Sequence, residues 1–201
     1  MSVKLLNRRT VESVGKAAHS TIQPFDHPNI SILNRQRTKK INTRRLRQIT
    51  TGLFAELKIT EAELGINLVG AQEMALINET FLQHEGPTDV ITFDHLDSVG
   101  DDVRSLIIKK SESPHIRSYK FIHAELFICV DVALAQAKEF NSSWQAEVVR
   151  YVVHGVLHLL GHDDLKQHLR RKMKREENRL VRRLAKRFSL AQLSGAVKLR
   201  A

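Results

Sequence analysis

The chain has almost no cysteine: Cys129 is the only one among 201 residues, so no disulfide bond can form within it. This shortage is consistent with a reducing compartment. The apolar residues around Cys129 favour a buried core thiol over a nucleophile or a metal ligand. Long apolar runs are also lacking, because no segment approaches the ~20 residues of a membrane-spanning helix, and no secretory signal pattern is recognisable. We therefore expect a cytoplasmic protein without a membrane span.

Acidic and aromatic residues are scarce as well. The chain has 32 Lys and Arg against 22 Asp and Glu, which gives a net charge of +10 at pH 7. A surface of this sign attracts polyanions, such as nucleic acid, anionic membranes or acidic proteins. Aromatic residues make up only 5% of the chain. If the partner is a nucleic acid, base-stacking platforms should therefore be few and sequence specificity modest.

Hydrophobic periodicity divides the chain into an arm, one domain and a tail. Residues 1–28 are basic, show no regular period and contain Pro24 and Pro28 at their end, which predicts a flexible arm in preference to an organelle transit segment. The domain should cover residues 29–188, and residues 189–201 should form a C-terminal tail. No internal repeat or second boundary interrupts the domain. We therefore predict a single α+β domain in which a small mixed sheet of about four strands packs with about five helices.

The predicted strands and helices are distinguished by the spacing of their apolar residues, which alternate in a strand and recur at every third or fourth position in a helix. Strands are predicted at residues 30–34, 64–69, 88–93 and 124–130, with a long loop over 94–120 that could hold one more short strand at 105–110. Helices are predicted at residues 42–57, 73–82, 131–140, 144–160 and 166–188. Asp131 should cap the third of these helices, and Gly161 should end the fourth. The fourth helix has the widest apolar face, so it should be the central helix of the domain.

The end of that central helix carries a dense group of metal-ligand side chains. The run 154–164 reads His-Gly-Val-Leu-His-Leu-Leu-Gly-His-Asp-Asp. Residues four apart stack on one face of a helix, so His154 and His158 can each give one nitrogen to the same divalent ion, for which zinc is the first choice. Gly161 lets the chain turn back, which brings residues 162–164 within reach as a third ligand. The competing interpretation is a pair of satisfied histidines in a core or groove.

Gly155 bears on the kind of chemistry that such an ion could support. Zinc peptidases with a His-Glu-x-x-His motif place their general base at this position. Glycine has no side chain, so peptide hydrolysis by that route would lack its base. A metallohydrolase of peptides or small molecules is therefore disfavoured.

Three motifs follow one another along the chain. They are Asn78-x-x-Phe81 followed by Pro87-Thr-Asp-Val-Ile-Thr-Phe93, then Glu125-Leu-Phe-Ile-Cys-Val-Asp131, and last His154-Gly-x-Leu-His158-Leu-x-Gly161-x-Asp163. In sequence and in order they resemble the motifs of the YbeY family of endoribonucleases, also called rRNA maturation factors. Together they cover roughly residues 30–185. The resemblance implies an α+β fold with a small sheet, a zinc ion and cleavage of single-stranded RNA. It also implies a role in ribosome assembly, through 16S rRNA 3′-end processing and quality control of ribosomes.

The sequence departs from the family pattern at three positions. The family's third ligand is a histidine six residues after the second, where this chain has Asp164. We take Asp164 as the third ligand, with His162 in reserve, and its extra negative charge should make the ion a weaker Lewis acid. Leu82 stands where the family has an arginine; if that arginine holds phosphate, the contact must be made by another basic residue or be lost. Glu125 stands where the family usually has aspartate.

These features predict a zinc-dependent endoribonuclease with one zinc ion and with rRNA, ribosomal particles and ribosomal proteins as partners. Glu125 and Asp89 are the candidates for a general base. The basic last helix is the candidate RNA-binding surface, although many such runs are merely solvated, and its predicted contact residues are Arg171, Lys172, Arg175, Arg179 and Arg182. The main alternative is a non-catalytic ribosome assembly factor whose metal is structural.

Overall fold

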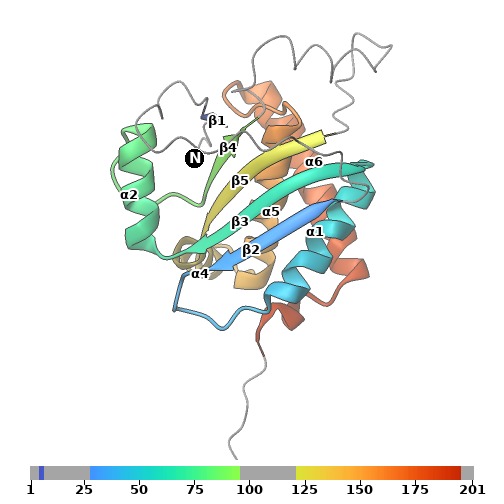
Figure 1. Ribbon diagram of the computed structural model, residues 1–201, viewed down its shortest axis with the longest axis horizontal. Helices are drawn as coiled ribbons and strands as arrows, with labels where there is room; N and C mark the ends of the chain where they lie inside the picture. The colour runs from blue at the N-terminus through green and yellow to red at the C-terminus, as the bar shows by residue number, and fades with distance from the viewer. Residues whose placement is uncertain (1–4, 7–27, 96–120, 196–201) are drawn as a thin grey trace, which may run out of the picture.

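The computed structural model describes residues 5–6, 28–95 and 121–195, and these form one α+β unit around a five-stranded sheet. The strands are β1 (Leu5–Leu6), β2 (Asn29–Asn34), β3 (Glu61–Val69), β4 (Val90–Asp94) and β5 (Phe121–Cys129). Their order across the sheet is β1-β4-β5-β3-β2 (Figure 1). β2, β3 and β5 run parallel, and β4 pairs antiparallel to β5. The predicted small mixed sheet is thus confirmed.

The sheet contains one strand more than the four main predicted ones. β1 is two residues long, lies within the segment predicted as an arm, and pairs in parallel with β4 through Leu5 and Leu6. The short strand predicted at 105–110 falls outside the described residues. β3 is also longer than predicted, because it begins at Glu61 rather than Leu64.

The α-helices in the described part of the chain are α1 (Thr43–Leu57), α2 (Ala71–Leu82), α4 (Val130–Glu139), α5 (Trp144–Leu159) and α6 (Gln167–Arg187). Figure 1 shows α1, α5 and α6 together behind the sheet, whereas α2 lies to one side. Side chains alternate across each strand, so Leu64, Ile66 and Leu126 join the large core that contains α1, α5 and α6. A smaller cluster of Val69, Met74, Ile91 and Cys129 forms against α2, and Cys129 is a buried free thiol, as predicted.

Asp131 caps a different helix from the one predicted. It lies in the first turn of α4, whose N-cap is Cys129. Its Oδ2 accepts a hydrogen bond from the backbone N–H of Ala71 at 2.7 Å, and its Oδ1 accepts from the Thr38 hydroxyl at 2.6 Å. The N-cap of α2 is Gly70, which has no side chain to offer, so the carboxylate from α4 satisfies that helix end instead.

The segment after α6 continues to pack on the domain. A short 3₁₀ helix, η3 (Leu190–Leu193), follows, and Leu193 is fully buried in the large core. The N–H of Asn42 donates to the carbonyl of Leu193 at 2.8 Å, which joins this segment to the start of α1. The region predicted as a tail therefore contributes at least these residues to the fold.

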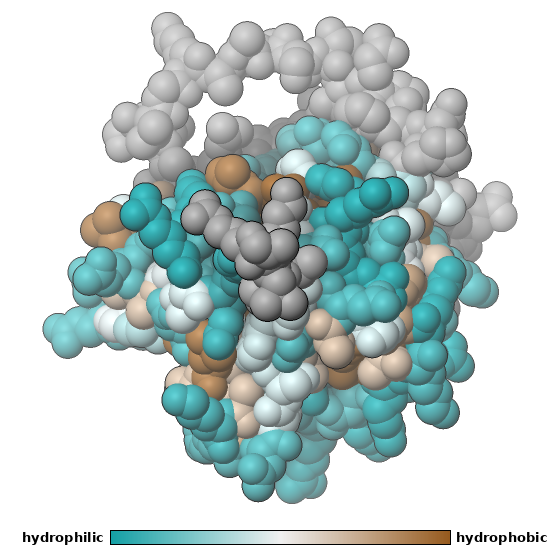
Figure 2. All heavy atoms as spheres, turned by 90° about the horizontal axis from the view of Figure 1, so that it is seen from below, coloured by the Kyte–Doolittle hydropathy of each residue, from teal (hydrophilic) through white to brown (hydrophobic). Residues whose placement is uncertain are grey.

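No helix among the described residues is long and apolar enough to cross a membrane. Viewed from the lower end of Figure 1, hydrophilic side chains cover most of the coloured surface, and apolar ones form separate small areas (Figure 2).

Candidate metal centre

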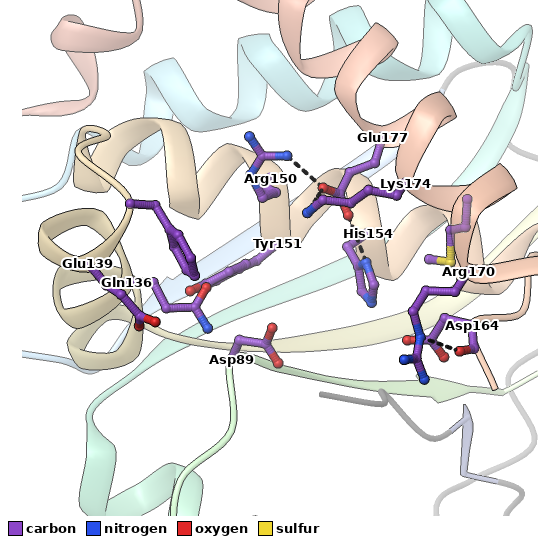
Figure 3. Close-up of a pocket in the computed structure, with 12 residues that line it drawn as sticks. Asp89, Gln136, Glu139, Arg150, Tyr151, His154, Asp164, Arg170, Lys174 and Glu177 are labelled. Carbon is purple, nitrogen blue, oxygen red and sulfur yellow. Dashed lines mark hydrogen bonds and ion pairs between the residues drawn. The ribbon is translucent and has the colours of Figure 1, made fainter. Parts of the chain in front are cut away.

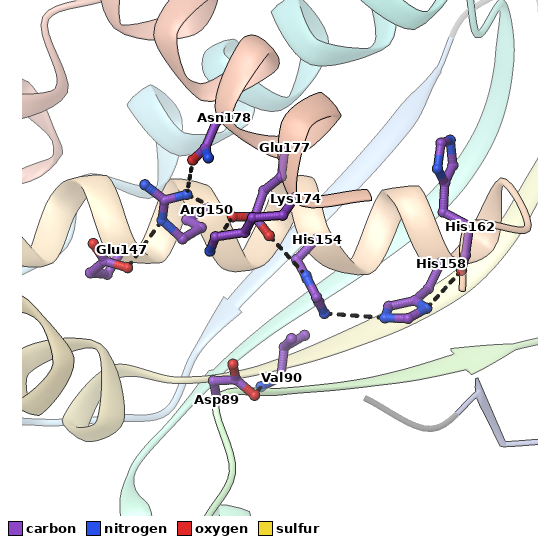
Figure 4. Close-up of polar contacts among 10 residues, drawn as sticks. All are labelled: Asp89, Val90, Glu147, Arg150, His154, His158, His162, Lys174, Glu177 and Asn178. Atoms are coloured by element: carbon purple, nitrogen blue, oxygen red, sulfur yellow. Dashed lines mark hydrogen bonds and ion pairs between the residues drawn. The ribbon is translucent and has the colours of Figure 1, made fainter. Parts of the chain in front are cut away.

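His154 and His158 lie on one face of α5, and their imidazole rings meet. Ser143 caps the helix by accepting the N–H of Ala146, and an apolar face runs from the cap toward the two histidines. The Nε2 atoms of His154 and His158 are 3.1 Å apart (Figure 4). Two nitrogens bound to one tetrahedral zinc at about 2.0–2.1 Å would stand about 3.3 Å apart. The spacing thus fits a shared ion.

The hydrogen bonds at the other ring nitrogens assign the tautomers. Nδ1 of His154 lies 3.0 Å from the Glu177 carboxylate, and Nδ1 of His158 lies 3.0 Å from the backbone carbonyl of His162. Both partners are acceptors, so each Nδ1 carries the proton and each Nε2 presents a lone pair. Two lone pairs that face each other at this distance repel unless a cation lies between them.

Asp164 brings a third possible ligand atom close to the two histidines. One carboxylate oxygen of Asp164 and one nitrogen of each histidine all lie within 4.8 Å of one another. Asp164 is 4% exposed, and its Oδ1 is buried without a hydrogen-bond partner among the described residues. A buried carboxylate oxygen without a donor is costly, and a divalent cation would satisfy it. This donor set of two imidazoles and one carboxylate suits zinc.

The chain turns at Gly161, which has a φ of +82° and so favours glycine. Figure 4 shows the His162 ring pointing away from the two clustered histidines, and only the backbone carbonyl of His162 contacts His158. Asp163 instead accepts the backbone N–H of Leu165 at 2.8 Å. Among residues 162–164, Asp164 alone is therefore grouped with the histidine pair.

Glu177 on α6, which was not among the residues predicted from the sequence, contacts Nδ1 of His154. It is 3% exposed. Its second carboxylate oxygen accepts from Arg150 at 2.6 Å and from Lys174 at 3.0 Å (Figure 4). Metal-binding histidines commonly have such a carboxylate behind them, which orients the ring and raises its basicity.

The position of Glu177 was visible in the sequence. On α6 the buried residues Met173, Glu177, Leu180, Val181 and Leu184 follow one helical stripe. An acid within an otherwise apolar stripe must have partners in the interior. That signal could have identified Glu177, but its partner could be found only from the packing of α6 on α5.

Burial and charge set the protonation of this group. Burial, and then the neighbouring His154, lowers the pKa of His158 to about 4, so His158 is neutral and available as a ligand at neutral pH. Burial alone would raise the pKa of Glu177, but hydrogen bonds to His154 and the two cations lower it to about 2. The carboxylate is therefore ionised across the physiological range.

The two candidate general bases lie on opposite faces of the sheet. Asp89, at the start of β4, lines the same pocket as His154 and Asp164 (Figure 3). Its Oδ1 accepts the backbone N–H of Val90 at 2.9 Å. Glu125 lies over Gly65 on the other face, because its neighbour Leu126 is the β5 side chain that contacts α5. The structure therefore brings Asp89, and not Glu125, to the histidines.

Gly155 faces β4 and β5 across a tight contact between α5 and the sheet. A Cβ at this position would come within 2.7 Å of Leu126 Cδ2 and 3.2 Å of Thr92 Oγ1. The side-chain hydrogen of glycine therefore permits the packing that places the histidines. A glutamate base at this position would have no room.

The basic helix α6 keeps most of its charges in solvent. Among the predicted RNA-binding residues, Arg171, Lys172, Arg175 and Arg182 are exposed. Arg179 is half-buried and pairs with Glu176, so its charge is partly neutralised. Leu82, in place of the family's arginine, packs against the small core cluster at α2.

Fold and site together define a small α+β protein with a two-histidine, one-aspartate group that could hold a metal ion beside a charged pocket. The sequence profile described as Endoribonuclease YbeY matches residues 31–185. The chain belongs to the YbeY family.

Individual relatives agree with this assignment. An Endoribonuclease YbeY of Aquifex aeolicus is 30% identical over 153 residues, which cover 73% of this chain and 90% of the relative. One from Syntrophotalea carbinolica is 27% identical over 161 residues, which cover 79% of this chain and 97% of the relative. The solution structure of TM1509 from Thermotoga maritima superposes with a TM-score of 0.53 at 20% identity, covering 86% of this chain and 99% of that protein. At that identity the superposition shows the fold alone.

Proposed function

We propose that the protein is a zinc-dependent endoribonuclease that cleaves single-stranded RNA in the cytoplasm and acts in rRNA processing, including 16S rRNA 3′-end maturation and ribosome quality control. The observation that carries the proposal is the convergence of His154, His158 and Asp164 beside a pocket lined by both basic and acidic side chains, in a chain of an endoribonuclease family. Ribosomal particles, with their proteins, are the proposed partners.

Each proposed role rests on a placed side chain. His154, His158 and Asp164 would hold zinc, which when bound lowers the pKa of water and polarises a phosphoryl oxygen. Glu177 orients His154 through Nδ1. Asp89 lines the pocket and can accept the proton of the attacking hydroxyl. Arg170 and Lys174 line the same pocket and can hold the RNA phosphate.

The first experiment compares wild type with His158→Ala on an end-labelled single-stranded RNA, with metal analysis of both proteins. We expect the variant to lose both bound zinc and cleavage. His168→Ala, which changes an exposed histidine on α6, is the matched control and should behave as wild type. Equal cleavage by wild type and His158→Ala would contradict the proposal that a bound metal ion is needed for catalysis.

Metal analysis also tests the third ligand, and the cleavage products identify the nucleophile. Asp164→Ala should lower the zinc stoichiometry, and an unchanged stoichiometry would assign the third ligand elsewhere. Attack by the RNA 2′-hydroxyl leaves a 2′,3′-cyclic phosphate, whereas attack by water does not. The chemistry of the product ends therefore distinguishes the two routes.

A second function is favoured by one observation. Leu82 is packed in an apolar cluster where the family has an arginine, so this chain lacks a charge that could contact phosphate there. A non-catalytic ribosome assembly factor with a structural metal fits that loss. Bound zinc without RNA cleavage by the wild-type protein would favour this second function.

A further inference from the structure

The pocket beside the candidate metal centre extends well beyond the metal ligands. Its volume is about 510 Å³, which falls in the range of sites that hold a small organic molecule. His154 and Asp164 lie at one end, with α6 above them (Figure 3). The other end reaches the last turn of α4, where Glu139 and Phe140 line it. A metal ion and a water molecule would occupy only part of this space.

Tyr151 places a buried hydroxyl in the wall of the pocket. It lies on α5 one turn before His154, it is 2% exposed, and its hydroxyl has no hydrogen-bond partner within the described parts of the chain. Burial raises the pKa of Tyr151, so the hydroxyl keeps its proton and can donate. A buried hydroxyl without a partner is unfavourable, and a polar ligand in the pocket would remove that cost.

Phe140 places an exposed aromatic ring at the same end. It follows the last residue of α4, lines the pocket, and is 62% exposed. A large exposed ring that lines a pocket is a suitable platform for a flat ligand. Base-on-aromatic stacking is the usual way in which proteins hold unpaired nucleobases.

Charge differs between the two ends of the pocket. Arg170, which donates to the Asp164 carbonyl at 2.9 Å, and Lys174 lie beside the metal ligands, where a phosphate is favoured. Glu139, which precedes Phe140 in the chain, lines the opposite end of the pocket (Figure 3). Carboxylates accept hydrogen bonds from the amino groups of bases, which uracil lacks.

We propose that this pocket holds one nucleotide of the RNA strand, with its phosphate at Arg170 and Lys174 and an amino-bearing base stacked on Phe140, its edge toward the Tyr151 hydroxyl. The proposal rests on the proposed RNA-cleaving function and adds a base subsite to it. Guanine, adenine and cytosine carry an amino group, so a strand with one of these bases in the subsite should be preferred over one with uracil.

The test is a calorimetric titration of the full-length, zinc-supplemented protein with AMP, CMP, GMP, UMP and ribose 5-phosphate. For wild type we expect UMP to bind more weakly than the other three nucleotides, and ribose 5-phosphate most weakly. Phe140→Ala should weaken the binding of AMP, CMP and GMP by about 5- to 30-fold and leave ribose 5-phosphate unchanged. Leu76→Ala, which removes an exposed side chain on α2 outside the pocket, should change none of these affinities.

Tyr151→Phe separates binding from a structural role. The variant keeps the ring and deletes only the unpaired hydroxyl, so the nucleotide-free protein should melt at a higher temperature while its affinity for the amino-bearing nucleotides falls. Wild-type affinity in both Phe140→Ala and Tyr151→Phe would overturn the base subsite, as would equal binding of AMP and ribose 5-phosphate. Equal affinity for UMP would overturn the amino-group preference. Nucleotide binding as expected, without RNA cleavage, would contradict the proposed endoribonuclease function and leave the subsite standing.

Discussion

The buried carboxylate of Glu177 holds three side chains in place, on α5 and on its own helix. Its carboxylate contacts His154 on one side and Arg150 and Lys174 on the other, so a negative charge is held in the interior by three donors. Such a charge would be prohibitively costly alone. Through these contacts Glu177 links α6 to α5, the helix that carries the two histidines.

Replacing Glu177 by Gln should weaken zinc binding by about 10- to 100-fold, because the amide is a poorer acceptor for the His154 Nδ1 proton. Competition against a zinc-chelating dye would measure the change. Glu176→Gln makes the same substitution at the neighbouring residue, whose carboxylate pairs with Arg179, and should leave the affinity unchanged. Equal zinc affinity in the two variants would contradict the orienting role of Glu177.

His158 should make the stability of the metal-free protein depend on pH. Its pKa of about 4 lies below the ordinary value of 6.5, so the unfolded state takes up the proton first. The contribution of His158 to the free energy of unfolding is fully present above pH 6.5. It is lost as the pH falls toward 4, and the loss amounts to at most about 3 kcal/mol. Urea unfolding at several pH values would measure this slope.

His158→Gln removes the titrating ring and should flatten the slope of stability against pH between 6.5 and 4. His162→Gln is the comparison, because burial also lowers the pKa of His162, which is more exposed. It should flatten the slope less. Parallel curves for wild type and His158→Gln would contradict the assignment.

At the scale of elements, the contact between α5 and the sheet depends on Gly155. Helix propensity alone would make Gly155→Ala stabilising by about 1 kcal/mol. The added Cβ would lie 2.7 Å from Leu126 Cδ2, and overpacking of this kind costs about 1–3 kcal/mol. We expect a net loss of up to about 2 kcal/mol in the free energy of unfolding, measured by urea denaturation.

A double variant isolates the cause of that loss. Leu126→Ala creates space beside Gly155, so Gly155→Ala should cost less in the Leu126→Ala background than in wild type. Strictly additive effects of the two substitutions would show that the contact does not determine the cost.

At the scale of the whole molecule, the net charge of +10 should appear as salt-dependent RNA binding. The triple change of Arg171, Lys172 and Arg175 to Gln removes three exposed charges from α6. If each contacts a phosphate, the slope of log affinity against log salt should decrease by about 2 for a single strand. Fluorescence anisotropy with a labelled RNA would measure it.

The control for that experiment is a second triple variant with the same net charge as the first. Changing Arg37, Lys58 and Lys138 to Gln also removes three exposed positive charges, all outside α6. We expect this variant to keep most of the wild-type slope. Identical slopes for the two triple variants would assign the effect to overall charge and not to α6.

Local patterns predicted most of the elements. The helices at α1, α5 and α6 begin and end within a residue or two of their predicted limits, because their apolar residues repeat at the helical period and their ends carry caps such as Asn42 and Ser143. The cap assignment at Asp131 was wrong, since its partner Ala71 lies sixty positions away in the chain. Caps can be predicted from sequence only when both partners are neighbours.

Features that depend on residues a few positions apart could be predicted from the sequence. The pairing of His154 with His158 follows from helical geometry, and the α+β class follows from two hydrophobic periods. Other features are visible only in the folded chain: Glu177 contacts His154, Glu125 lies on the far face of the sheet, and Tyr151 and Phe140 line the same pocket. These relations join separate elements, and the way elements pack depends on the summed burial of many side chains and not on any single spacing.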